Sequence, residues 1–207
     1  MKSFEDTKRS AGPGAWNYSF EPDRFFLRAV KGLENLGVVC PFLGNIYSRL
    51  FYDKMLRNEA RMSGITPGMK VIHIGCGPLP MTAMFLAGFG ARVTAVDMED
   101  DILSQASRVI FRNRLCDRIR FVRDCGTRIN FSGYNAIWLS LHVRPMDVII
   151  RRALKFMDQG ARVIFRGTRG KLAGFYQNID HHMLDGLVNW KEIQQPMGKK
   201  SIILKKS

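Results

Sequence analysis

The chain has 207 residues, of which 46% are hydrophobic, and its formal net charge at pH 7 is +14. This length suits one domain with a small appendage, and the apolar fraction is sufficient for a substantial core. No run of about 18 apolar residues occurs, and the N-terminus lacks the apolar core of a secretion signal, so we expect a cytoplasmic protein without a transmembrane helix. The four cysteines show no metal-ligand spacing, so we expect free thiols and no metal site.

The excess of basic residues permits binding to nucleic acid, to an anionic membrane or to an acidic protein. Six arginines form the densest basic patch: Arg108, Arg112, Arg114, Arg118, Arg120 and Arg123. No recognisable RNA-binding module accompanies this patch. We therefore expect a solvated basic face and a small-molecule substrate. Nucleic acid and an anionic membrane remain open as partners but are not favoured, and a homodimer is possible.

Residues 1–66 are expected to form an N-terminal arm and a small helical lid. Residues 1–20 mix glycine, proline, serine and both charges, as in a flexible arm. Apolar residues at steps of three and four then predict two helices, over residues 22–36 and about residues 43–62. This helical pair precedes the first strand and could fold over a ligand. The lid tyrosines that could face that ligand are Tyr47 and Tyr52.

A glycine turn between a strand and a helix organises the rest of the chain. The β-branched run at residues 71–74 predicts a buried strand, and an apolar stretch after Gly77 predicts a helix. Glycines let a ligand approach the backbone, and the free N–H groups of the helix can bind a ribose or a carboxylate. A plain C-cap before a core helix gives the same pattern. The expected ligand contacts here are Gly75, Cys76, Gly77 and Pro78.

An acidic residue, Asp97, closes the next apolar run, 22 residues after Gly75. A carboxylate about 20 residues past the glycines grips a ribose diol in dinucleotide-binding sheets. Pro80 takes the place of the third glycine; it suits the first turn of a helix but not a pyrophosphate cradle. The pattern therefore indicates a nucleoside ligand without a diphosphate, and S-adenosylmethionine is the obvious candidate. The alternative for Asp97 is a solvated loop carboxylate.

Strands alternate with helices through the remainder of the chain. Expected helices cover about residues 99–115, 146–157 and a stretch ending at 176; expected strands cover 119–123, 136–141 and 161–166. Two last strands, about 188–194 and 201–205, predict an antiparallel hairpin. The sequence thus predicts an α/β fold: a Rossmann-like, doubly wound parallel sheet over residues 67–207, with a C-terminal hairpin.

Ligands of such sheets lie at the carboxyl ends of the strands. Five polar or glycine residues stand at four of these predicted ends, the last two at the same one: Gly75, Asp97, Asp124, Ser140 and His142. Asp124 suits an acceptor for an adenine amino group, and His142 is either a proton acceptor or a strand-end hydrogen-bonding residue. The neighbouring positions complete the expected ligand contacts: Met98, Cys125 and Leu141.

These features resemble class I S-adenosylmethionine-dependent methyltransferases over residues 70–207, except that His73 stands where that fold usually has an acidic residue. Residues 75–82, GCGPLPMT, resemble the GxGPLPLT signature of nicotianamine synthases. Residues 166–176, RGTRGKLAGFY, resemble that family's segment after the fifth strand. The PF-x-x-N stretch at residues 41–45 is a weaker match to the end of the family's helical domain.

The resemblance implies S-adenosylmethionine as a substrate whose aminobutyrate arm is used: a nitrogen attacks Cγ and methylthioadenosine leaves. The family's longer N-terminal domain supplies a glutamate, for which this chain offers Glu21, Glu34 and Glu59 by type alone. A short lid favours a small acceptor or none. Without an acceptor, the amino group of the ligand closes a ring on its own Cγ. The chain is similar in size and plan to azetidine-2-carboxylate synthases, with a cage of Tyr47, Tyr52, Phe175 and Tyr176.

Two other classes of function remain open. One is a methyltransferase acting on a small molecule, a lipid or RNA, in which His142 or Tyr176 would accept a proton or wall the acceptor site. Residues 140–143, SLHV, differ from the N/D-P-P-Y/F pattern of enzymes that methylate the amino groups of bases. The other is a ligand-binding or scaffold subunit that has lost turnover.

Overall fold

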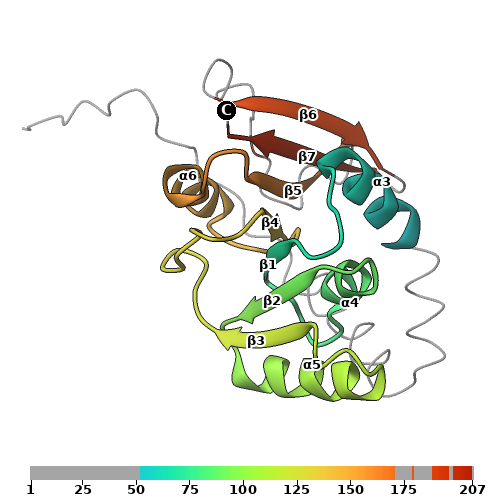
Figure 1. Cartoon of the computed structure of the whole chain (residues 1–207). Helices are drawn as coiled ribbons and strands as arrows, with labels where there is room; N and C mark the ends of the chain where they lie inside the picture. Colours follow the sequence, from blue (N-terminus) through green and yellow to red (C-terminus); the bar gives the residue numbers. More distant parts are fainter. Residues whose placement is uncertain (1–51, 171–178, 180–187, 196–197, 207) are drawn as a thin grey trace, which may run out of the picture.

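The computed structural model describes residues 52–170, 179, 188–195 and 198–206. These residues form one seven-stranded sheet in the order β3-β2-β1-β4-β5-β7-β6 (Figure 1). The strands are β1 (Lys70–Ile74), β2 (Arg92–Asp97), β3 (Ile119–Arg123), β4 (Ala136–Leu139), β5 (Arg162–Thr168), β6 (Asn189–Gln194) and β7 (Lys199–Lys205). Strands β1 to β5 are parallel, whereas β7 runs antiparallel between β5 and β6.

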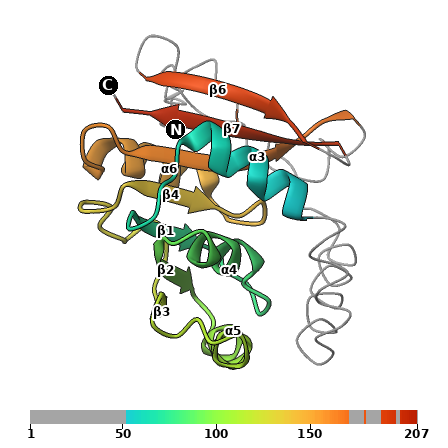
Figure 2. The ribbon, with the colours of Figure 1, turned by 45° about the vertical axis from the view of Figure 1, so that its right-hand side comes forward.

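Helices cover both faces of the sheet. The described helices are α3 (Asp53–Ser63), α4 (Met81–Gly88), α5 (Asp100–Arg112) and α6 (Met146–Phe156). Because strand residues alternate between faces, β1 contributes Val71 to the apolar cluster beneath α3, α4 and α5, and Ile72 to the cluster beneath α6. Figure 2 shows α3 lying across β5 and β7. The sheet is therefore wound on both sides with the apolar core in two layers.

The predicted α/β fold, its doubly wound sheet and its C-terminal antiparallel hairpin are confirmed. Strand β4 ends at Leu139, two residues earlier than expected, and β7 begins at Lys199, two residues earlier. Helix α5 ends at Arg112 because Arg114 adopts a left-handed backbone with φ 56°. The predicted arm, the first lid helix and the helix ending at residue 176 lie outside the described residues, so the division at residues 66 and 67 stays a prediction.

Three features of the described residues bear on the expectations about membrane spans, metal sites and thiols. No helix among the described residues is long and apolar enough to cross a membrane. Within the same residues, no group of three or more histidine, cysteine, aspartate or glutamate side chains is arranged to hold a metal ion. The three described cysteines are free thiols.

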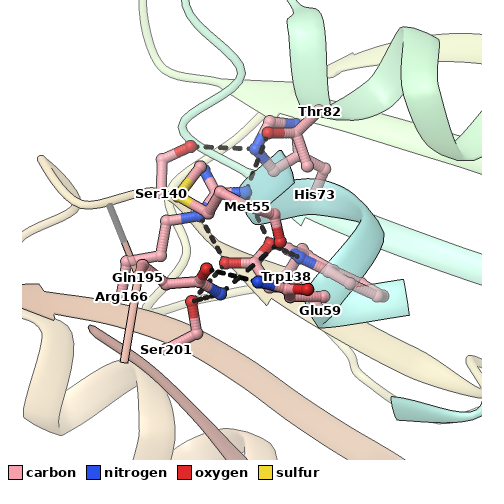
Figure 3. A network of polar contacts seen from close by, with 10 residues as sticks. Met55, Glu59, His73, Thr82, Trp138, Ser140, Arg166, Gln195 and Ser201 are labelled. Carbon is pink, nitrogen blue, oxygen red and sulfur yellow. Dashed lines mark hydrogen bonds and ion pairs between the residues drawn. The ribbon is translucent and has the colours of Figure 1, made fainter. Parts of the chain in front are cut away.

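A buried ion pair joins helix α3 to the sheet (Figure 3). The carboxylate of Glu59, on α3, accepts hydrogen bonds from Nε and Nη2 of Arg166 on β5, both at 2.8 Å. Glu59 also accepts from Nε1 of Trp138 at 2.9 Å and from the hydroxyl of Ser201 at 2.6 Å. Both partners of the pair are almost completely buried. One carboxylate therefore binds α3 to β4, β5 and β7 at once.

The donors around Glu59 decide its charge. Burial on its own would raise the pKa of Glu59, but the Arg166 guanidinium and the hydroxyl and indole donors outweigh burial and hold that pKa below its ordinary value. Burial likewise opposes the charge on Arg166, and the Glu59 carboxylate outweighs it, so the pKa of Arg166 is raised. Both groups are charged at neutral pH. Since each charge was taken out of water, each depends on the other.

Removing one partner of this pair tests its structural weight. We expect Arg166→Met to lower the free energy of unfolding by about 3–5 kcal/mol, because Glu59 is left as an uncompensated buried charge. Urea unfolding followed by circular dichroism measures the change. The double variant Glu59→Leu with Arg166→Met should lose less than the single variant, since no charge stays buried.

The matched control is Arg57→Met, which removes the exposed ion pair between Arg57 and Asp53 on the same helix. We expect no measurable change in stability from this control, because solvent-exposed pairs contribute little. A loss in Arg166→Met no larger than in Arg57→Met would contradict the assigned role of the buried pair.

Candidate functional site

The turn after β1 is held against β2 by its own backbone. The N–H groups of Gly75 and Cys76 both donate to the carbonyl of Val96, at 2.9 and 3.1 Å. Gly75 has φ +72°, and a Cβ atom there would lie 2.6 Å from Cγ2 of Val143. Only glycine meets both conditions, since an L-residue is strained at this φ and the space is filled. The sequence pattern GCG thus marks a real constraint on the backbone.

The carboxylate of Asp97 lies over this turn. Its Oδ2 accepts the N–H of Gly77 at 3.1 Å, and its Oδ1 accepts the N–H of Met98 at 2.8 Å. Each oxygen keeps a further lone pair for a ligand hydroxyl. Met98 is 58% exposed beside it, which leaves an apolar surface next to the carboxylate. The structure therefore brings the glycine turn and Asp97 together, as the sequence predicts.

The end of β3 adjoins the end of β2. The N–H of Asp124 donates to the carbonyl of Asp97 at 3.1 Å. The Asp124 carboxylate accepts the N–H of Cys125 at 2.7 Å and lies 3.4 Å from Arg128. A hydrogen bond with Thr127 lowers the pKa of the Cys125 thiol. Asp124 and Cys125 thus follow Asp97 along one edge of the sheet.

The end of β4 closes the site on the other side of the turn. The N–H of Ser140 donates to the carbonyl of Ile74 at 3.1 Å, and Leu141 next to it is half-buried. Ser140 also lies 3.6 Å from the position of a Cβ on Gly75. His142 is exposed on the turn two residues further. Gly75, Asp97, Asp124 and Ser140 therefore occupy neighbouring strand ends, with His142 outside the strands.

His73 departs most from an ordinary buried residue. It is 1% exposed, and its Nε2 is 2.8 Å from the hydroxyl of Ser140 (Figure 3). Among the described buried side chains, its Nδ1 is the polar atom without a hydrogen-bond partner. Burial, and then the positive charge of Arg166, lower the pKa of His73 to about 3. The carboxyl end of β1 therefore carries a neutral imidazole.

Of the tyrosines expected near the ligand, only Tyr52 lies within the described part of the chain. Its ring centroid is 5.4 Å from Nζ of Lys199 and 6.0 Å from Cζ of Arg166, so the ring attracts cations where β5 ends and β7 begins. Tyr47 and Tyr176 lie outside the described residues, as do Phe175 and two of the three candidate glutamates, Glu21 and Glu34. The carboxylate of Glu59, the third candidate, is paired with Arg166 and is therefore not available as a base.

Sequence reasoning missed the polar network behind the site. Arg166 follows the apolar run at residues 163–165 of β5 and is itself buried, and Glu59 lies among the buried residues of α3 with Met55, Leu56 and Ala60. Two opposite charges at core positions were the available signal. Thr82, at the start of α4, accepts a further hydrogen bond from Nη2 of Arg166 at 3.2 Å, which extends the network to the glycine-turn helix.

The chain is similar in sequence and in structure to known proteins. A family model described as nicotianamine synthase protein matches residues 38–206. A variant of MtNAS in complex with S-adenosylmethionine superposes with a TM-score of 0.74 at 22% identity, covering 88% of this chain and 75% of that chain. MtNAS in complex with MTA and tNA gives a TM-score of 0.73 at 22% identity, covering 89% and 74%.

Other proteins to which the chain is similar include methyltransferases. A SAM-dependent methyltransferase from Aquifex aeolicus superposes with a TM-score of 0.62 at 12% identity, covering 76% of this chain and 91% of that chain. A sterol 24-C-methyltransferase from Gibberella zeae is 28% identical over 120 residues, which are 53% of this chain. The match spans 32%, about a third, of that enzyme's own length. The class I methyltransferase fold expected from the sequence is confirmed.

The buried neutral imidazole predicts a pH dependence of stability. The pKa of His73 is about 3 in the folded protein, and about 6.5 in an unfolded chain, so below pH 6.5 the unfolded chain binds a proton that the native protein does not. We expect His73 to lower the free energy of unfolding by about 1.4 kcal/mol per pH unit as the pH falls from 6.5 towards 3. Urea unfolding at pH 7, 6, 5 and 4.5 measures this slope.

The reference for that slope is His73→Gln, which keeps an amide within reach of Ser140 but has no group that titrates in this range. Its stability should fall less steeply than that of the wild type over the same interval. Parallel curves for the two proteins would mean that His73 is protonated in the native state, contrary to its burial beside Arg166.

Proposed function

Because the chain belongs to the nicotianamine synthase family, we propose that it uses the aminobutyrate arm of S-adenosylmethionine, with cyclisation of that arm to azetidine-2-carboxylate as the reaction. The observation that carries this proposal is the neutral His73 at the carboxyl end of β1. The MtNAS structures with S-adenosylmethionine and with MTA support the ligand class. Transfer of the same arm to a separate acceptor amine is the nearest alternative.

The reaction needs a neutral amine. The lone pair of the α-nitrogen attacks Cγ, the Cγ–S bond breaks, and its electron pair converts the sulfonium into the neutral thioether of methylthioadenosine. The ammonium form of the substrate first releases one proton to water, and the ring nitrogen carries the charge of the product. Since the sulfonium is already a good leaving group, the protein has to hold nitrogen and carbon in line and keep the amine deprotonated.

The described residues around β1 and β4 suit a neutral amine. Residues 75–82 and 140–145 contain no acidic side chain. The buried carboxylate of Glu59 is paired with Arg166, and the positive charge of Arg166, after burial, lowers the pKa of His73, so a further cation is disfavoured here. An amine placed against His73 and Ser140 finds hydrogen-bonding groups without a negative charge. A carboxylate at position 73 would instead hold the amine as an ammonium ion.

The rest of the ligand fits the other strand ends in this proposal. The ribose diol would donate to Asp97, and the adenine would lie beside Met98 with its amino group towards Asp124. The ligand carboxylate would lie at the start of α4, where the first backbone N–H groups of a helix have no partner within it. Tyr52, together with Tyr47 and Tyr176, would form the aromatic cage for the sulfonium. His142, which is exposed two residues after Ser140, would lie at the solvent side of the site.

Incubation of the full chain with S-adenosylmethionine alone tests the proposal. We expect methylthioadenosine and azetidine-2-carboxylate in equal amounts by mass spectrometry, above a control without enzyme. Asp97→Asn should raise KM about tenfold through loss of a charge-assisted hydrogen bond to the ribose. Asp101→Asn, an exposed position on α5, is the matched control and should leave KM unchanged.

Other products would separate the alternatives. Methylthioadenosine formed only after an amine acceptor is added would replace cyclisation by intermolecular transfer. S-adenosylhomocysteine formed with cell extract, without methylthioadenosine, would contradict the proposal and leave a methyltransferase. Homoserine or its lactone at the level of the enzyme-free control would mean spontaneous breakdown and no cyclisation.

A further inference from the structure

A hollow lies at the amino ends of β1, β2 and β3, opposite the strand ends that carry the glycine turn. Its volume is about 440 Å³, and it is lined by the first residues of β1, β2 and β3 together with residues 132–134. Lys70 pairs with Arg92, and Thr94 pairs with Arg120, in the registers of adjacent strands. Since alternate residues share one face of a sheet, these four side chains project on the same side.

The charge around this hollow is strongly unbalanced. One carboxylate, that of Asp117, lines the hollow. Four cationic side chains line it as well: Lys70, Arg92, Arg118 and Arg120. Arg118 lies 3.7 Å from Asp117, which accounts for that carboxylate. The side chains of Lys70 and Arg92 make no hydrogen bond or ion pair to any described residue. A hollow lined by one sign of charge concentrates counter-ions of the other sign.

Two hydroxyl groups add an unused donor to this hollow. Arg120 donates from Nε to the hydroxyl of Thr94 at 2.9 Å and from Nη2 to the hydroxyl of Tyr134 at 3.0 Å. The two hydroxyl oxygens are 3.2 Å apart and share one hydrogen bond. Two hydroxyls carry two hydrogens, so one hydrogen is left without an acceptor inside this triangle. Tyr134 donates the shared hydrogen bond, so the remaining hydrogen is that of Thr94, which is 5% exposed and lines the hollow.

We propose that this hollow is a second ligand site, which binds the phosphate group of a small molecule. The volume is in the range of small-molecule sites, roughly 300–1,000 Å³. Arg120 is fixed by its two hydroxyl partners, and a fixed guanidinium is the preferred partner of an oxyanion. Lys70 and Arg92 supply mobile positive charge, and the spare hydroxyl hydrogen supplies a neutral donor. The site is separate from the strand ends that carry the proposed reaction.

Calorimetric titration of the full chain with inorganic phosphate and with ribose 5-phosphate tests this site. We expect saturable binding with a Kd below about 10 mM for at least one probe. Tighter binding of ribose 5-phosphate would assign a phosphate ester as the ligand, and equal binding would assign free phosphate. Lys70→Gln and Arg120→Gln should each weaken binding about tenfold.

Arg108→Gln is the matched control, because it removes one exposed positive charge of α5 outside the hollow. It should leave Kd within about twofold, as expected for screened charges at a distance. The double variant Thr94→Val with Tyr134→Phe removes both hydroxyls without a change of charge and should weaken binding several-fold. Lys70 is exposed, so its variant keeps the test valid if a buried substitution fails to fold.

Three results would overturn the proposal. One is no saturable binding of either probe. The second is an equal loss of affinity in Arg108→Gln and Arg120→Gln, which would indicate a diffuse basic surface. The third is binding only to a single-stranded RNA oligonucleotide or to phosphatidylserine vesicles, which would assign the basic face to a macromolecule or a membrane.

Discussion

The buried pair of Glu59 and Arg166 holds together the parts of the molecule on which its chemistry depends. It joins α3 to the sheet, reaches the indole of Trp138 and the hydroxyl of Ser201, and extends through Thr82 to the helix after the glycine turn. Because its two charges offset each other, the Glu59 carboxylate is not left as an unpaired negative charge in the core. The pair also places the cation that, after burial, helps to keep His73 neutral. Packing and site electrostatics therefore have one common origin.

Much of the fold could be predicted because its signals are local. The β-branched run at residues 71–74, the glycines that follow and the apolar run before Asp97 each fix an element from neighbouring residues, and their alternation implies a parallel sheet. The same logic placed Gly75, Asp97, Asp124 and Ser140 at one edge. The insertion of β7 between β5 and β6 and the pairing of residue 59 with residue 166 could not be predicted this way. Both depend on partners far apart in the chain, and each charge taken alone resembles a surface residue.

The carboxyl ends and the amino ends of the parallel strands carry different chemical groups. At the carboxyl edge, backbone N–H groups, two carboxylates and a neutral imidazole surround the glycine turn, which suits a nucleoside with a reactive amino acid arm. At the amino edge, Lys70, Arg92 and Arg120 surround a hollow with unused donors, which suits an oxyanion. Strands β1 and β2 run from one edge to the other, so a single sheet carries both sets of groups. Part of the basic composition of the chain therefore lies at one defined place.

If the site keeps the amine of its ligand neutral, as we propose, the protonation of that amine can be measured directly. S-adenosylhomocysteine labelled with ¹⁵N at the α-amino group has the same arm but lacks the reactive sulfonium. Its amine can be titrated by NMR when bound to the full chain and when free. We expect the pKa of the amine to be lower by about one unit or more in the bound ligand than in the free ligand, and that shift to be reversed in His73→Asp. A bound amine whose pKa equals or exceeds that of the free ligand would contradict it.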